Sequence, residues 1–147
     1  MIEGFGDMGA SVSLAAVGSA LGAGTAGMAA VGAWKKCYAQ SKAAPFILTA
    51  FVGAPLTQTI YGYILKNAIK AANIPPEAYK WQLTYGLLGG IAMGFSAWMQ
   101  GKAAASASDA LAETGKGFGQ YMIVLGIIET VALFVMVFLM TTLPKVA

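Results

Sequence analysis

The stretch FGQYMIVLGIIETVALFVMVFLMTTL, residues 118–143, contains a single charged side chain, Glu129, in an otherwise apolar run. A helix of about 20 consecutive apolar residues crosses the hydrocarbon core of a bilayer. Residues 118–143 are long and apolar enough to do so. The stretch therefore predicts a transmembrane helix with a carboxylate inside it.

Three further stretches have the same character, namely residues 8–33, 45–65 and 81–100. The chain of 147 residues is 58% hydrophobic and 10% charged, whereas soluble proteins contain about 25% charged residues. The first stretch follows Glu3 and Asp7 and is longer than the apolar part of a signal peptide, so we expect a retained helix. The sequence predicts an all-α, multi-pass protein of the cell membrane with four transmembrane helices.

The connectors between these stretches, residues 34–44, 66–80 and 101–117, are short and polar. They leave no room for a soluble catalytic domain, so we expect a chain that is not an enzyme by itself. Cys37 falls in the first connector, where we expect a free surface thiol. The net charge of +3 comes from scattered lysines rather than from the basic patch that binds nucleic acid, so we expect no nucleic acid partner.

The lysines of the connectors bear on the topology. If the first and third connectors share one side of the membrane, that side holds Lys35, Lys36, Lys42, Lys102 and Lys116 with Asp109 and Glu113. The other side then holds Lys66, Lys70, Lys80 and Lys145 with Glu3, Asp7 and Glu77. Because cytoplasmic loops carry an excess of lysine and arginine, the margin of five lysines to four favours external termini and cytoplasmic hairpin loops.

The two halves of the chain resemble each other. Each half opens with a helix rich in glycine and alanine and closes with a bulkier apolar helix. Placing residues 56–60 over residues 127–131 aligns the closing helices and sets Gln58 on Glu129. We therefore predict two duplicated helical hairpins, of which only the second has a carboxylate. The predicted hairpins are residues 1–73 and 74–147.

Small residues recur at helical spacing in the two opening helices, at Gly18 and Gly22, then at Gly86, Gly90 and Gly94. Residues four apart share one face of a helix, and a face of small residues lets helices in lipid approach closely. Two explanations stay open. The first helix lies in the inner layer of a ring of copies, or the glycines serve ordinary packing inside a four-helix monomer.

Glu129 lies eleven residues after Phe118 and fourteen before Leu143, which places it near the middle of the membrane. A charge at that depth costs about 2.5–3.5 kcal/mol even on insertion scales, so such residues are rare unless they are functional. The alternative is a structural carboxylate that is hydrogen-bonded within the bundle. We expect Glu129 to be the centre of an ion site.

Polar side chains on two other helices can complete that site. Thr57, Gln58 and Tyr61 project from one sector of the second predicted helix, and Gln100 ends the third. Pro55 removes a backbone hydrogen bond and so leaves a carbonyl oxygen available in the preceding turn. Gathered around a carboxylate, these oxygens suit a hard cation.

These motifs resemble those of a known family. The stretch PLTQTIYG at residues 55–62, the stretch QGKAAA at residues 100–105 and the pair Glu129-Thr130 resemble the proteolipid, or K subunit, of rotary V-type and A-type ATPases. The duplicated four-helix form of sodium-pumping bacterial enzymes is the most similar. Leu56 and Thr59 stand where that family usually has glycine.

The resemblance implies a site and a function. The implied ion ligands are Glu129, Thr57, Gln58, Gln100 and the backbone carbonyl of Ala54, with Tyr61 hydrogen-bonded to the carboxylate. The implied function is that of a rotor-ring subunit that carries Na⁺. Carriage of H⁺ by the same rotor and a small four-helix cation transporter are the alternatives.

The resemblance also implies partners. These are further copies of the chain in a ring, a stator membrane subunit that supplies an arginine, a central-stalk subunit and membrane lipid. The transported ion is the only bound group that we expect, with no other cofactor. ATP hydrolysis or synthesis would take place on other subunits, because the chain has no phosphate-binding Gly-x-x-x-x-Gly-Lys-Ser/Thr motif.

Overall fold

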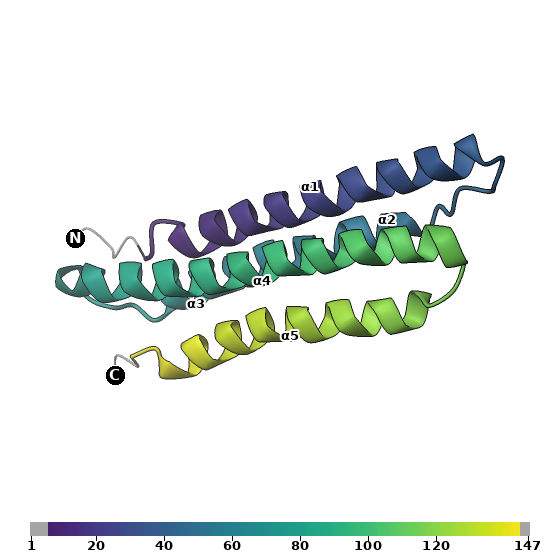
Figure 1. Cartoon of the computed structure of the whole chain (residues 1–147). Helices are drawn as coiled ribbons and strands as arrows, with labels where there is room; N and C mark the ends of the chain where they lie inside the picture. The colour runs from purple at the N-terminus through teal and green to yellow at the C-terminus, as the bar shows by residue number, and fades with distance from the viewer. Residues whose placement is uncertain (1–5, 145–147) are drawn as a thin grey trace.

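Helices account for all the regular structure in residues 6–144, the part of the chain that the computed structural model describes, and this confirms the all-α fold class (Figure 1). In chain order the elements are α1 (Ala10–Ala39), α2 (Leu48–Gly53), the 3-10 turn η1 (Ala54–Leu56), α3 (Thr57–Ala71), the 3-10 turn η2 (Pro76–Ala78), α4 (Tyr79–Thr114) and α5 (Phe118–Thr142). Glu3 and Lys145, which entered the charge count, lie outside the described residues.

The long helices lie side by side, with α1 on one side of α4 and α5 on the other (Figure 1). Helix α1 packs mainly on α4, and α5 packs on α4 and α3. Two glycines form the turn between α4 and α5. Gly115 and Gly117 have φ of 66° and 92°, in the left-handed region that glycine adopts without steric cost. Helix α5 therefore starts at Phe118, where the apolar stretch predicted it.

Helices α1 and α4 are longer than the sequence predicted. Helix α1 continues to Ala39 and α4 continues to Thr114, so most of the expected connector over residues 101–117 is helical. Residues 101–114 are rich in alanine, the strongest helix former. Apolar runs indicate how much of a helix lies in hydrocarbon, and they do not indicate where the helix ends.

Cys37 is a correction that follows from the longer α1. The prediction of a surface thiol in a loop is wrong, because Cys37 lies on α1 with 3% of its surface exposed. It continues the buried stripe formed by Ala26, Ala30 and Ala33 at spacings of three and four residues. Residues so spaced share one helix face, and this face packs inside the bundle.

The second predicted span, residues 45–65, is a broken helix. Helix α2 ends at Gly53, and the turn η1 carries Pro55 at its second position. Proline cannot donate the backbone hydrogen bond that a continuous α-helix needs. The chain resumes as α3 at Thr57 and extends past the predicted end to Ala71.

Two of the described helices, α1 and α5, are long and apolar enough to cross a membrane. Helix α5 exposes large apolar side chains along much of its length, for example Ile123, Ile127 and Phe134. Such a surface suits lipid or the apolar face of another subunit. The count of four spans, the duplication of the hairpins and the assembly of a ring stay predictions.

Glycines bring the backbones of α1 and α4 into contact. A Cβ atom at Gly18 would overlap the backbone of Gly94, and one at Gly101 would overlap the backbone of Gly22. The close approach that the glycine spacing predicted thus occurs between two helices of one chain. Packing inside the monomer accounts for these glycines, and their place in a ring stays untested.

Charged groups join α1 and α4 at the end where the first and third connectors lie. The Nζ of Lys36 is 3.3 Å from Asp109 Oδ1 and 2.7 Å from Glu113 Oε1. Exposed pairs of this kind contribute little to stability, because water and salt screen the charges. They do place the two connectors at the same end of the bundle, as the charge count assumed.

We expect Gly22→Ala to lower the thermal stability of the detergent-solubilised protein. The new Cβ would overlap the carbonyl of Ala97 on α4 and lie 2.9 Å from the Cβ of Pro55. Overpacking of this kind costs about 1–3 kcal/mol. The matched control is Gly32→Ala on the same helix, where a Cβ meets nothing within 4 Å. It should leave the melting temperature unchanged or raise it, and equal losses in both variants would contradict the contact.

Candidate ion-binding site

Glu129 is held from two neighbouring helices. The hydroxyl of Tyr61, on α3, donates a hydrogen bond of 2.8 Å to Oε1. The amide of Gln100, on α4, donates one of 3.2 Å to Oε2. Each carboxylate oxygen therefore has a donor that does not belong to α5.

A chain of side-chain hydrogen bonds extends from the carboxylate back to the broken helix. Gln58 Nε2 donates to Gln100 Oε1 at 2.8 Å, and the hydroxyl of Thr57 lies 3.3 Å from Gln58 Oε1. Both amide side chains are completely buried. Gln100 Nε2 also donates to the backbone carbonyl of Leu125 at 3.0 Å. The buried amides are thus satisfied by one another, as buried polar groups must be.

The backbone carbonyl of Ala54 lies at the start of this chain. The hydroxyl of Thr57 is 3.2 Å from it, within the turn that Pro55 creates. The structure therefore gathers all six residues that the family resemblance implied. Their roles as ligands stay predictions. They are Ala54, Thr57, Gln58, Tyr61, Gln100 and Glu129.

This arrangement offers oxygens of three kinds, namely carboxylate, hydroxyl and amide or peptide carbonyl. Within residues 6–144 no three His, Cys, Asp or Glu side chains come together. A cation here would be held by the single carboxylate of Glu129 and by neutral oxygens. Such a set suits a singly charged hard ion, because one carboxylate balances its charge.

Sequence reasoning missed Ser96. Its hydroxyl donates to the carbonyl of Ile128 at 2.8 Å, directly before Glu129. The signal was available, since Ser96 lies four residues before Gln100 and shares its helix face. Two side chains of α4 that lie one turn apart therefore bond to the backbone of α5. They fix the position of Glu129 along the bundle axis relative to Gln100.

Asp7 is a buried carboxylate, which the sequence analysis treated only as a flanking charge. It is 1% exposed. Its oxygens accept hydrogen bonds from the backbone N–H groups of Gly9 and Ser11 at 3.0 and 2.9 Å, and from the Ser11 hydroxyl. Gly86 leaves the room that it occupies. An acceptor of this kind satisfies the free N–H groups at the start of a helix, so the start of α1 accounts for Asp7.

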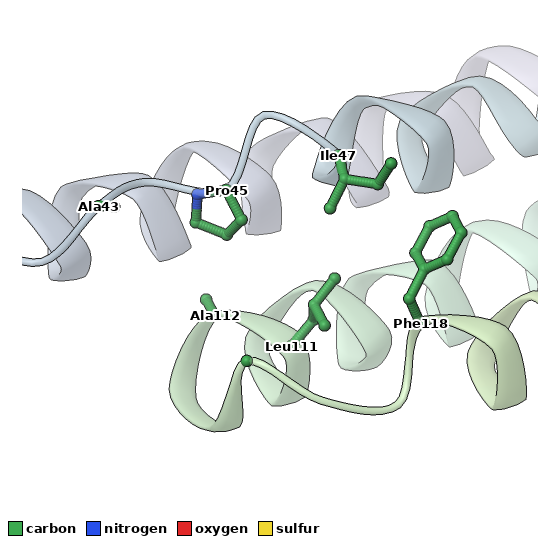
Figure 2. Close-up of a pocket in the computed structure, with 7 residues that line it drawn as sticks. Ala43, Pro45, Ile47, Leu111, Ala112 and Phe118 are labelled. Atoms are coloured by element: carbon green, nitrogen blue, oxygen red, sulfur yellow. The ribbon is translucent and has the colours of Figure 1, made fainter.

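A groove of about 440 Å³ opens at the other end of the bundle, between the segment before α2 and the turn from α4 to α5 (Figure 2). Pro45, Ile47, Leu111 and Phe118 are among the side chains that line it. None of its lining side chains is charged or polar. Glu129 is eleven residues along α5 from Phe118, about 16 Å at 1.5 Å per residue, so the groove is separate from the candidate site.

Residues 83–141 match the family model of the ATP synthase C subunit. The matched segment runs through most of α4 and α5 and includes Gln100 and Glu129. It excludes Thr57, Gln58 and Tyr61, which belong to the first half of the chain. A comparison with curated proteins found no match.

The match covers less than half of the chain and supports a relationship to the proteolipid family of the ATP synthase C subunit. It agrees with the resemblance that the motifs suggested, at the level of this proteolipid family. The sodium-pumping type and the duplicated form are finer assignments than this match carries.

We expect Gln100→Ala to destabilise the protein by at least about 2 kcal/mol, because it opens a cavity and leaves buried polar groups without partners. The side chain makes three hydrogen bonds, to Gln58, Leu125 and Glu129. Thermal unfolding in detergent measures the loss. Gln120→Ala, at an exposed glutamine of α5, is the control and should have almost no effect. A small and equal loss in both variants would show that the network contributes no stability.

Proposed function

We propose that this chain is the ion-binding rotor-ring subunit in the membrane sector of a V-type or A-type rotary ATPase, and that it carries Na⁺ on Glu129. One observation carries the proposal. A carboxylate in the middle of an apolar helix, within the segment that matches the proteolipid family, is held by Tyr61 and Gln100. Buried amides continue the network to the break at Pro55.

Charge explains how such a carboxylate would drive rotation. With a cation bound, Glu129 is neutralised and its face of the ring can move through lipid. Once the ion leaves, the charge is costly in hydrocarbon and is stable only beside a positive group. The ring would then turn in the direction that reloads each empty site before it meets lipid.

The positive group would come from another subunit. The chain contains no arginine, and among the described residues the ion pairs involve Lys36 at the end of the bundle. Lys102 lies within α4, not in a connector as predicted. It is two residues past Gln100, about 200° around the helix, and its ammonium group lies 4.1 Å from the ring centroid of Trp98. A stator arginine is the counter-charge that we propose.

Sodium requires more oxygens than a proton does. Glu129, Thr57, Gln58, Gln100 and the Ala54 carbonyl would supply five, and these groups already form one connected cluster. A bare Na⁺ needs several oxygens to replace its hydration shell, by the same logic as other hard cations. The size of this set favours Na⁺.

The proton alternative has an observation of its own. The amide oxygen of Gln100 accepts a hydrogen bond from Gln58, so the network is satisfied without a cation. A proton on Glu129 would need little rearrangement. Sodium would require at least one amide to turn its oxygen toward the ion.

The remaining partners follow from the rotor role. The exposed apolar side chains of α5 and α3 would contact neighbouring copies and lipid, and the complete complex would add the stator and a central stalk. ATP hydrolysis or synthesis would occur on soluble subunits.

A small cation transporter is the competing function. It would run as a monomer or dimer on a native gel, whereas a rotor subunit would run as a large ring.

We expect Glu129→Gln to abolish ion transport by the assembled complex while the ring still forms. The amide has nearly the shape of the carboxylate and costs less to bury, but it has no charge to exchange. ATP-driven ion uptake into vesicles measures the effect. The control is Glu113→Gln, which removes an exposed carboxylate paired with Lys36 and should leave transport intact. Ion pumping by the Glu129→Gln complex would refute the proposal.

We expect millimolar Na⁺ to slow the modification of Glu129 by a carbodiimide at fixed, mildly acidic pH. The reagent attacks the protonated acid, and a bound cation excludes that proton. K⁺ at equal ionic strength should protect far less, because the larger ion fits the oxygen set poorly. Thr57→Ala should weaken the protection by Na⁺. If Na⁺ protects no more than K⁺, the transported ion is the proton.

A further inference from the structure

Ser19 of α1 is a buried hydroxyl without a hydrogen-bond partner. It is 2% exposed, and its Oγ bonds to no other group in the described structure. Hydroxyls elsewhere on these helices donate to the carbonyl one turn earlier, as Thr25 does to Leu21 and Thr84 does to Lys80. A buried hydroxyl that stays unpaired is destabilising, so a partner in another state of the molecule would stabilise the region around Ser19.

Two contacts define how α1 packs against the broken helix. A Cβ atom at Gly62 of α3 would lie 2.9 Å from the Cβ of Ala15. A Cβ at Gly22 of α1 would lie 2.9 Å from the Cβ of Pro55. Helix α1 and the broken helix therefore run antiparallel here. The two contacts are seven residues apart along α1 and seven residues apart along the broken helix.

Ser19 and Gln58 occupy matching positions between these contacts. Ser19 is four residues after Ala15 and three before Gly22. Gln58 is four residues before Gly62 and three after the proline. Steps of three and four residues stay on one helix face, and both side chains are buried. This register places Ser19 and Gln58 at the same level of the contact between α1 and the broken helix.

The Gln58 amide has a hydrogen to spare. Of its two N–H bonds, one is directed to Gln100 Oε1 at 2.8 Å. A cation between Gln58, Gln100 and Glu129 would attract both amide oxygens and repel the –NH₂ groups. The bond between the two amides must then break, and the Gln58 amide must turn so that its nitrogen faces away from the ion.

We propose that Ser19 is a positioning residue for the cation site, and that its hydroxyl accepts a hydrogen bond from the Gln58 amide once that amide has turned its oxygen to Na⁺. The inference rests on the proposed sodium-carrying function. It adds α1 to the site, which otherwise draws on α3, α4 and α5. Proton binding to Glu129 needs no such turn. Ser19 therefore strengthens the binding of Na⁺ relative to that of H⁺.

The test compares Ser19→Ala with Ser108→Ala in the assembled ring. Ser108 is the matched control, because it is also fully buried on a helix with an unpaired hydroxyl and lies eight residues past Gln100, about 12 Å along α4. Carbodiimide labelling of Glu129 is measured over a range of Na⁺ concentrations, and over a range of pH without Na⁺. Both substitutions put alanine in a helix, which favours folding.

We expect Ser19→Ala to raise the Na⁺ concentration that gives half-protection about five- to tenfold, the effect of losing one hydrogen bond, with the sodium-free pH profile unchanged. Ser108→Ala should change neither. If sodium protects the unaltered ring but Ser19→Ala shifts half-protection no more than Ser108→Ala, the role of Ser19 is refuted and the rotor function stands. A shift of the pH profile equal to the sodium shift would also refute it. An unaltered ring that sodium does not protect would refute Na⁺ as the ion and the role of Ser19 together.

Discussion

The carboxylate of Glu129 lies partly buried within an apolar helix, and its need for hydrogen-bond donors is the constraint on which the rest of the structure depends. Apolar neighbours on α5 cannot satisfy it, so donors must arrive from other helices. Tyr61 and Gln100 supply them, and Gln100 must itself be satisfied by Gln58 and by the carbonyl of Leu125. Each buried polar group thus requires the next one, and the requirement fixes how α3, α4 and α5 lie around one point.

Close packing of α1 on α4 fixes the position of the α4 donors along the bundle axis. Gly18 and Gly22 let the backbone of α1 reach that of α4, so α4 has little freedom to slide. Helix α5 has no comparable backbone contact. It is positioned through side chains, among them Ser96 and Gln100, which bond to its carbonyl oxygens. The ion site therefore lies where two helices in backbone contact meet a helix that packs through side chains, apolar ones in the core clusters and the polar pair Ser96 and Gln100.

Much of the site was predictable from the sequence, because its chemistry is exceptional in its surroundings. A carboxylate in an apolar run, a proline in another and amides near both stand out, and the structure gathers them. The lengths of α1 and α4 were not predictable in the same way, because a helix can continue past its apolar run. Helix α4 does so through an alanine-rich segment, and α1 does so through residues 34–39, which include two lysines. The burial of Cys37 depends on the continuation of α1, and the burial of Asp7 depends on the room left by Gly86. Ser96 was missed because a single serine on an apolar helix has many possible partners.

The hydrogen-bond chain crosses from one half of the protein to the other, and this gives the covalent connection between the halves a role in assembly. Thr57, Gln58 and Tyr61 come from the first half, whereas Gln100 and Glu129 come from the second. Neither half holds the complete set. As separate chains they would have to meet by diffusion in the membrane and would also pair with copies of themselves. A covalent connection of a few residues gives the complementary half a high effective concentration, and it keeps the two kinds of half in equal number in any assembly that the chain builds.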